Sequence, residues 1–289
     1  MKAMLCALAL MICLTGCAPK EEPSSSAQPA AENETLLMIN GKEVPAWRYL
    51  CWLDRAVAQG LDETAAKAQA LSDTALYAAV EAMAEEYGVT LTEEERAALS
   101  PGVWAELPEE QWRQLSAVGM LYGKLCSLEI PEETLKAFGT EKGWRTVDRI
   151  LIPAGEDAAG KAAEVFARLN GGGEEAFNAA KSESADTLGQ RTFLPGDGTL
   201  APALEDAAAA LSQGQLSGIL ESEEGFSILY CLPLDTEQMR IPWLDAELQR
   251  RAETADIEAL PGYETLNISA GYRPVSDGNV ENGADASSS

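Results

Sequence analysis

Apolar residues along the chain follow two different patterns, and the change falls near Trp144. Before it, apolar positions recur at the spacing of amphipathic helices. After it, short apolar runs alternate with such helices and with glycine-rich turns, an order typical of a small sheet domain. The pattern therefore predicts an α+β fold, in which a helical lobe precedes a small sheet domain with flanking helices.

The helical part opens with a short strand and a turn at 36–41. A helix usually starts at a proline or behind an Asp, Ser or Thr cap. It usually ends just before a glycine. These signals predict helices over 45–60, 63–87, a short one behind the capping box at 92–95, then 108–126 and 131–139.

Beyond Arg145, strands and helices alternate. The expected strands are 146–152, 191–194, 218–220 and 226–232, which gives a four-stranded sheet. The expected helices are 157–169, 177–181 and 201–211, and a last amphipathic helix runs over 242–257.

The first seventeen residues have the features of a secretion signal. Lys2 precedes an apolar run at 3–14, which is shorter than the roughly 20 residues that span a bilayer. The stretch Leu14-Thr15-Gly16-Cys17 resembles the bacterial lipobox, which implies cleavage before Cys17 and a diacylglyceryl anchor on its thiol. An ordinary secretory signal with an incidental cysteine is the alternative. We expect a signal peptide over 1–16, a lipidated Cys17 with a flexible tether over 17–34, and a protein anchored at the extracytoplasmic face of the cell membrane.

Charge and residue usage narrow the function classes. Lys and Arg number 21 against 47 Asp and Glu, a net charge of −26. Such a chain repels nucleic acid and anionic headgroups, so no nucleic-acid partner is expected and the membrane link is the lipid. Histidine is absent, which removes Ser-His and Cys-His nucleophiles and the commonest zinc ligand.

Three cysteines remain once the signal and the anchor are set aside, namely Cys51, Cys126 and Cys231. Each stands among apolar neighbours without a C-x-x-C spacing, which favours buried thiols over redox or metal chemistry. The sequence leaves one disulfide among them open. Neither a metal nor another cofactor is expected.

Several segments after Trp144 stand in a fixed order: 147–152, 163–172, 177–182, 188–189, 200–207, 211–218 and 224–229. Together they resemble the strands, helices and turns of a parvulin-type (PpiC-like) peptidyl-prolyl isomerase domain. No single segment is specific, but the ordered set is.

The stretch Leu37 to Val44 is similar to the N-terminal chaperone segment of secreted parvulin-like foldases, and with the lipobox the chain resembles a Gram-positive foldase lipoprotein. In that family the helix after the parvulin domain packs back on the N-terminal helices. The resemblance thus implies a chaperone-like lobe over 35–142, a parvulin-like domain over 143–236, a C-terminal helix over 237–262 that completes the lobe, and a polar tail over 263–289.

The chain departs from the family at its catalytic positions. Where active parvulins place two histidines and an intervening cysteine or aspartate, this sequence aligns Arg149, Ser227 and Ser184. The methionine and phenylalanine that wall the family's proline pocket become Leu200 and Leu204. The resemblance implies a substrate-binding set of Leu188, Phe193, Leu200, Leu204 and Phe226.

Isomerisation twists an amide over a barrier of about 18–20 kcal/mol, so a catalyst needs a proline slot and polar groups aimed at the rotated carbonyl. Loss of both imidazoles and of the aromatic wall predicts weak or absent isomerase activity. The favoured hypothesis is a foldase that binds unfolded or newly exported polypeptides on an apolar groove of the lobe. Two alternatives are an active isomerase in which Arg149 polarises the carbonyl, and a non-catalytic solute-binding or envelope-assembly lipoprotein. The sequence leaves a homodimer open.

Overall fold

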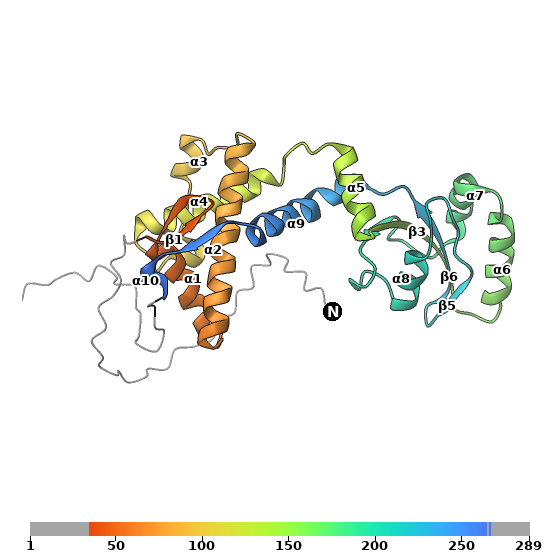
Figure 1. Cartoon of the computed structure of the whole chain (residues 1–289). Coiled ribbons are helices and arrows are strands. Elements are labelled where there is room, and N and C mark those ends of the chain that lie inside the picture. The colour runs from red at the N-terminus through yellow and green to blue at the C-terminus, as the bar shows by residue number, and fades with distance from the viewer. Residues whose placement is uncertain (1–34, 265, 267–289) are drawn as a thin grey trace, which may run out of the picture.

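The computed structural model describes residues 35–264 and 266, which form a helical lobe and a sheet domain joined through helix α5 (Figure 1). The predicted α+β fold, with a helical lobe completed by a C-terminal helix and a four-stranded sheet domain, is confirmed. The predicted signal peptide, Cys17 and tether lie outside the described residues, as does the predicted tail apart from residues 263, 264 and 266.

The lobe is built around the long helix α2 (Glu63–Glu86). Asp62 caps this helix by accepting a hydrogen bond from the Ala65 amide, as its sequence signal predicted. The buried face of α2 consists largely of alanines, whose small side chains let neighbouring helices approach closely. The other helices of the N-terminal part are α1 (Ala46–Ala58), α3 (Glu93–Ala97) and α4 (Glu109–Leu125), with a single 3-10 turn at Gly102–Trp104.

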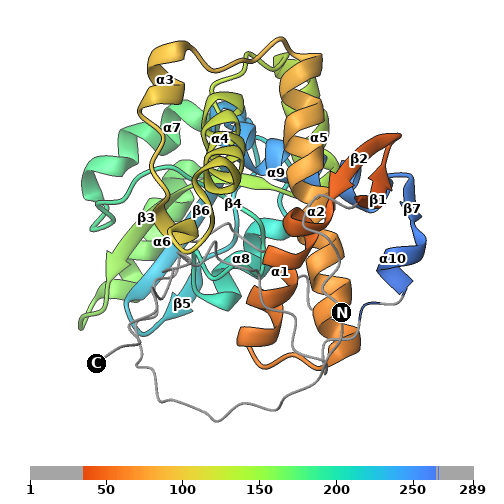
Figure 2. The same cartoon turned by 90° about the vertical axis from the view of Figure 1, so that its left-hand side faces the viewer.

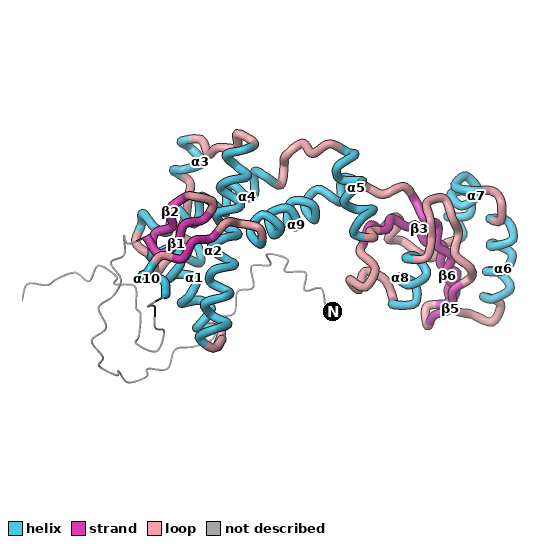
Figure 3. Tube along the Cα trace, in the orientation of Figure 1, coloured by secondary structure: helices cyan, strands magenta, loops and turns pink. Residues whose placement is uncertain are grey.

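The C-terminal end of the chain returns to complete the same lobe. Helix α9 (Arg240–Glu253) packs along α2 and buries Leu244, Leu248 and Ala252 in the main core. Strand β7 (Ile257–Ala259) then pairs with β1 (Thr35–Ile39), which also pairs with β2 (Lys42–Pro45), and all pairs are antiparallel. A short helix α10 (Pro261–Glu264) follows. Figure 3 shows this small sheet lying against the helices of the lobe.

Two details of this end differ from the sequence prediction. The last helix ends at Glu253 rather than near Ile257, because Ile257 pairs with Ile39 in the sheet. The helix also begins at Arg240, two residues before Pro242. A proline is tolerated in the first turn of a helix, because the backbone amides there have no partner within the helix.

Helix α5 (Glu132–Lys142) leads from the lobe into β3 (Arg145–Pro153), the first strand of the sheet domain. Helix α5 runs past Gly139, where the sequence predicted its end, and stops at the left-handed Gly143. Gly139 lies inside the helix, where its missing side chain leaves space for Leu234 and Met239 of the returning chain. The remaining elements are α6 (Ala158–Leu169), α7 (Gly173–Ala180), 3-10 turn η2 (Lys181–Glu183), β4 (Arg191–Phe193), α8 (Pro202–Ala209), β5 (Leu220–Ser222), β6 (Gly225–Leu232) and 3-10 turn η3 (Thr236–Met239).

The four strands pair antiparallel in the order β4-β3-β6-β5. Because side chains alternate along a strand, the sheet has two distinct faces. Ile150, Ile152, Ile228 and Tyr230 pack against α6 and α7 on one face, while the other face is turned to α8 (Figure 2). We call the second one the α8 face; it carries Val147, Arg149, Leu151, Ser227 and Leu229.

Over the described residues, no helix is both long and apolar enough to cross a membrane. The three cysteines of this part of the chain are free thiols, and Cys51 and Cys231 are buried.

We expect the thiols of Cys51 and Cys231 to resist alkylation in the folded protein. Burial raises the pKa of both thiols, that of Cys51 to about 12, so little reactive thiolate forms near neutral pH. Iodoacetamide labelling followed by peptide mass spectrometry would measure this, with labelling in urea as the reference. Equal rates of labelling at Cys51 in the folded and the unfolded chain would contradict it.

Candidate functional site

The three positions that align with the parvulin catalytic residues meet around Leu151 of β3. Ser227 pairs with Leu151 across the ladder to β6. The hydroxyl of Ser184 accepts a hydrogen bond of 2.9 Å from the Leu151 amide, at the other edge of β3. Arg149 lies two residues before Leu151 and therefore points to the same face of the sheet. The structure thus brings together residues that are far apart in the sequence.

Arg149 is held in a network of ion pairs on this face. Its Nε donates to Asp186 Oδ2 at 2.8 Å, and its Nη1 donates to Glu224 Oε2 at 2.8 Å. Arg191 binds the second oxygen of Asp186 at 2.7 Å, and the Leu188 amide donates to that oxygen as well. The side chains of Arg149 and Asp186 are only 9% and 2% exposed. Two cations and two anions therefore form a network without net charge.

The protonation states of Asp186 and Arg149 are fixed over the neutral range. Burial raises the pKa of Asp186, but hydrogen bonds from Arg191 and Arg149 outweigh it and lower the pKa to about 2. Burial acts to lower the pKa of Arg149, and its bonds to Asp186 and Glu224 raise it above the ordinary value. Neither group can exchange a proton near neutral pH, so this pair offers no general acid or base.

Ser227 contributes a hydroxyl but no reactive group. It is fully buried, and its Oγ has no hydrogen-bond partner among the described residues. A serine acts as a nucleophile only with a base in hydrogen-bond reach, which Ser227 lacks here. Ser227, which the sequence alignment places at one of the family's histidines, therefore has no activating base in this structure.

The leucines that align with the proline pocket belong to a packed core. Leu200, Leu204 and Phe193 are buried in one cluster with Val147 and Leu229 of the α8 face. The loop before α8 is fixed by the buried Glu205 carboxylate, which accepts hydrogen bonds from the Gly196 and Leu200 amides at 2.6 and 2.9 Å. These side chains pack together between the sheet and α8.

Two residues of the predicted substrate-binding set lie elsewhere. The Leu188 residue is 75% exposed on the loop beyond Asp186. Phe226 points to the opposite face of the sheet, where it packs with the cluster under α6 and α7. The structure therefore brings Phe193, Leu200 and Leu204 to the α8 face but not these two.

Sequence patterns did not identify four residues that organise this face, namely Asp186, Arg191, Glu224 and Glu205. A signal was present, since arginines within apolar strands such as Arg149 are almost never buried without an acidic partner. Which of the 47 acidic residues would supply it could not be derived from spacing, because the partners are 37 and 75 residues away.

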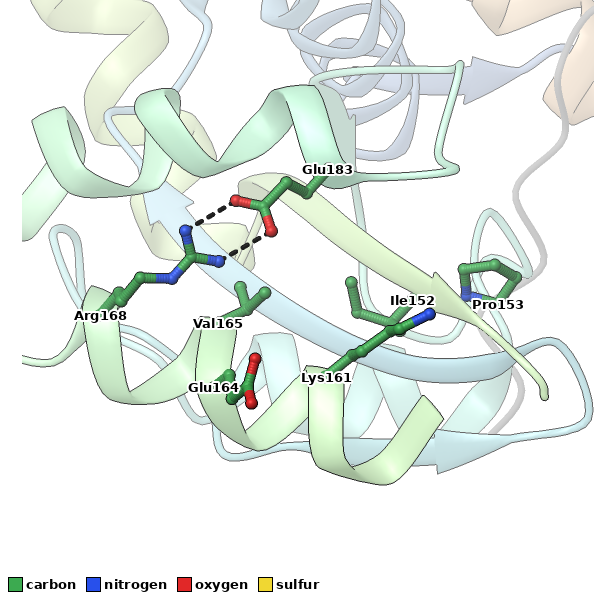
Figure 4. Close-up of a pocket in the computed structure, with 7 residues that line it drawn as sticks. All are labelled: Ile152, Pro153, Lys161, Glu164, Val165, Arg168 and Glu183. Atoms are coloured by element: carbon green, nitrogen blue, oxygen red, sulfur yellow. Dashed lines mark hydrogen bonds and ion pairs between the residues drawn. The ribbon is translucent and has the colours of Figure 1, made fainter. Parts of the chain in front are cut away.

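The cavity in Figure 4 lies on the other side of β3, beside α6. It has a volume of about 360 Å³ and is lined by Ile152, Pro153, Lys161, Glu164, Val165, Arg168 and Glu183. Arg168 and Glu183 pair with each other across it at 2.8 Å. Within the described part of the chain, no group of His, Cys, Asp and Glu is placed to hold a metal ion.

Comparison with known families gives a match over this domain. Residues 132–231, from the start of α5 to β6, match the family described as the PPIC-type PPIASE domain. This confirms the parvulin-type resemblance over the sheet domain. No curated protein matches the chain.

Solved structures of foldases are similar at low identity. PrsA from Bacillus subtilis shares 17% identity, with 77% of this chain and 91% of that chain covered and a TM-score of 0.30. The peptidylprolyl isomerase PrsA from Bacillus cereus shares 18% identity, covering 78% and 87%, with a TM-score of 0.28. A structure from work on the SurA-like chaperones PEB4 and Cj1289 of Campylobacter jejuni shares 12% sequence identity, with 79% of this chain and 100% of that chain covered and a TM-score of 0.23. Identities and TM-scores this low add nothing to the functional argument.

Proposed function

Because residues 132–231 form a parvulin-type, PPIC-type PPIase domain, we propose that the chain is an extracytoplasmic foldase that binds unfolded exported polypeptides and has weak or no isomerase activity. In this proposal, Cys17 carries the lipid that anchors the protein to the membrane. The observation that carries the proposal is the network of ion pairs among Arg149, Asp186, Arg191 and Glu224. The proposal takes Arg149 to stand where active members of the family have a histidine.

The network argues against an active isomerase that uses Arg149. To polarise a twisted carbonyl, a donor must be aimed at the oxygen without a stronger competing partner. The Nε and Nη1 of Arg149 already donate to Asp186 and Glu224. Ser227 adds no base, and the leucines that would wall the proline slot pack against the sheet.

The lobe supports the chaperone half of the proposal. Large apolar side chains exposed on it are Val57, Leu61, Tyr87, Val103 and, on α9, Ile241. In this proposal, they contact the apolar segments that an unfolded chain exposes and a native one buries. Tighter binding to an unfolded protein than to its native form would support this half, and equal binding would favour an envelope-assembly lipoprotein.

Refolding of a proline-limited model protein tests the enzymatic half. With the purified full-length protein present, we expect a higher final yield of native protein and an unchanged rate of the slow, proline-limited phase. The reason is that binding suppresses aggregation, whereas the inert α8 face lowers no barrier. The slow-phase rate and the yield are scored in the same experiment by the activity or fluorescence of the refolding protein.

The contradicting result is a faster slow phase that Leu200→Ala abolishes while circular dichroism shows that the variant is folded. That result would make the domain a working isomerase. A yield that does not change would instead remove the chaperone half.

A further inference from the structure

Glu224 is the exposed member of the network on the α8 face. It lies in the two-residue turn Glu223-Glu224 between β5 and β6, and its side chain is 62% exposed. Its carboxylate nevertheless reaches back to Nη1 of Arg149, whose side chain is 9% exposed. One buried cation is thus partnered from inside by Asp186 and from the solvent side by Glu224.

The strand register shows what this contact covers. Arg149 is opposite Leu229, Leu151 is opposite Ser227, and Pro153 is opposite Gly225 at the turn. The Leu151–Ser227 pair therefore lies between Arg149 and the turn on the same face, and the ion pair extends over it. Beneath it is the buried Ser227 hydroxyl, which has no partner among the described residues.

We propose that Glu224 fills a carboxylate-binding subsite on Arg149, and that an acidic side chain of an extended client segment binds there in its place. This inference rests on the proposed function, since the client is an unfolded polypeptide. The buried Asp186 stays in place because two arginines hold it, whereas Glu224 is attached through a single exposed pair. The exchange replaces one carboxylate by another, so no charge is left buried without a partner.

The energy of the exposed pair sets the size of the expected effect. Exposed ion pairs contribute up to about 1 kcal/mol, which corresponds to about fivefold in a binding constant. The net charge of −26 repels an acidic peptide at long range, but at 0.15 M salt the screening length is about 8 Å. At that salt concentration the contact with Arg149 decides the preference.

The test uses an apolar, acetylated and amidated peptide with a single glutamate, together with the same peptide carrying glutamine. Binding to the purified full-length protein is measured by fluorescence polarisation at 0.15 M salt. Glu224→Ala removes the internal carboxylate and is expected to tighten binding of the glutamate peptide about fivefold, with no change for the glutamine peptide. Glu223→Ala is the matched control, because it removes the same charge from the same turn without an ion pair to Arg149.

Equal tightening by both variants would overturn the proposal, because it would show only a reduced long-range repulsion. No change with Glu224→Ala, or no binding of either peptide to any variant, would also overturn it. In these cases the proposed function stands if the protein still binds an unfolded client. Loss of that client binding as well would show that the proposed function itself has failed.

Discussion

Asp186→Asn is expected to lower the free energy of unfolding of the sheet domain by about 3–5 kcal/mol, the cost of breaking a buried ion pair from one side. Asp186 is the only carboxylate that contacts both Arg149 and Arg191 among the described residues. With asparagine there, Arg191 loses its ion-pair partner and Arg149 keeps only the exposed Glu224. A neutral amide compensates for neither buried charge.

Hydrogen exchange in increasing urea, read by mass spectrometry, would measure this effect on peptides of β3 and β6. Tryptophan fluorescence would follow mainly the lobe, because five of the six tryptophans lie in it and only Trp144 stands at the start of the sheet domain, directly before β3. Glu224→Gln serves as the control and is expected to cost less than about 1 kcal/mol, because its side chain is exposed. An equal loss of unfolding free energy in the two variants would show that the buried Asp186 contributes no more to stability than the exposed Glu224.

The pH dependence of the same pair has a definite sign. Asp186 has a pKa of about 2 in the folded chain, below the roughly 3.9 of an unfolded aspartate. Its contribution of about 2.5 kcal/mol is therefore fully present above pH 4 and is lost as the pH falls through 2. The difference between wild type and Asp186→Asn should shrink over that window.

Local signals in the sequence predicted the elements that local physics determines. Asp62 and the capping box at Thr92 mark helix starts that the structure confirms. Strands β2 and β7 were missed because short strands form through distant pairing, here between Ile257 and Ile39, and their own sequences carry little signal. The end of α9 was misplaced for the same reason.

The candidate site was predictable in position but not in chemistry. The order of segments placed Arg149, Ser184 and Ser227 near one another, and the structure groups them around Leu151. What they do depends on Asp186 and Glu224, which come from loops whose conformation is set by the sheet. The alternation of strand side chains could have shown that Phe226, one residue before Ser227, points to the opposite face.

Leu248→Ala is expected to lower the free energy of unfolding of the lobe by about 2–5 kcal/mol, although Leu248 is 162 residues beyond the end of α2. The Leu248 residue is 2% exposed within the main core, which also contains residues of β1, α1, α2 and α4. If the lobe is one folding unit built from both ends of the chain, a cavity in α9 must weaken helices of the N-terminal part. Urea unfolding followed by tryptophan fluorescence tests this, because Trp47, Trp52, Trp104 and Trp112 all report on those helices.

Ile241→Ala in the same helix is the matched control, since Ile241 is 51% exposed and its truncation leaves no internal cavity. Its expected cost is below about 1 kcal/mol. Both leucine and isoleucine variants are made in a Trp243→Phe background, because Trp243 lies on α9 and would itself report release of that helix. If Leu248→Ala then left the fluorescence transition unchanged while hydrogen exchange showed α9 released, α9 would be only docked on an independently stable N-terminal lobe. A joint downward shift of both signals would instead show that the sheet domain is inserted into a single cooperative lobe. A client bound on the lobe could then alter the sheet domain through α5 and the returning η3 segment, which pack on each other and on α9.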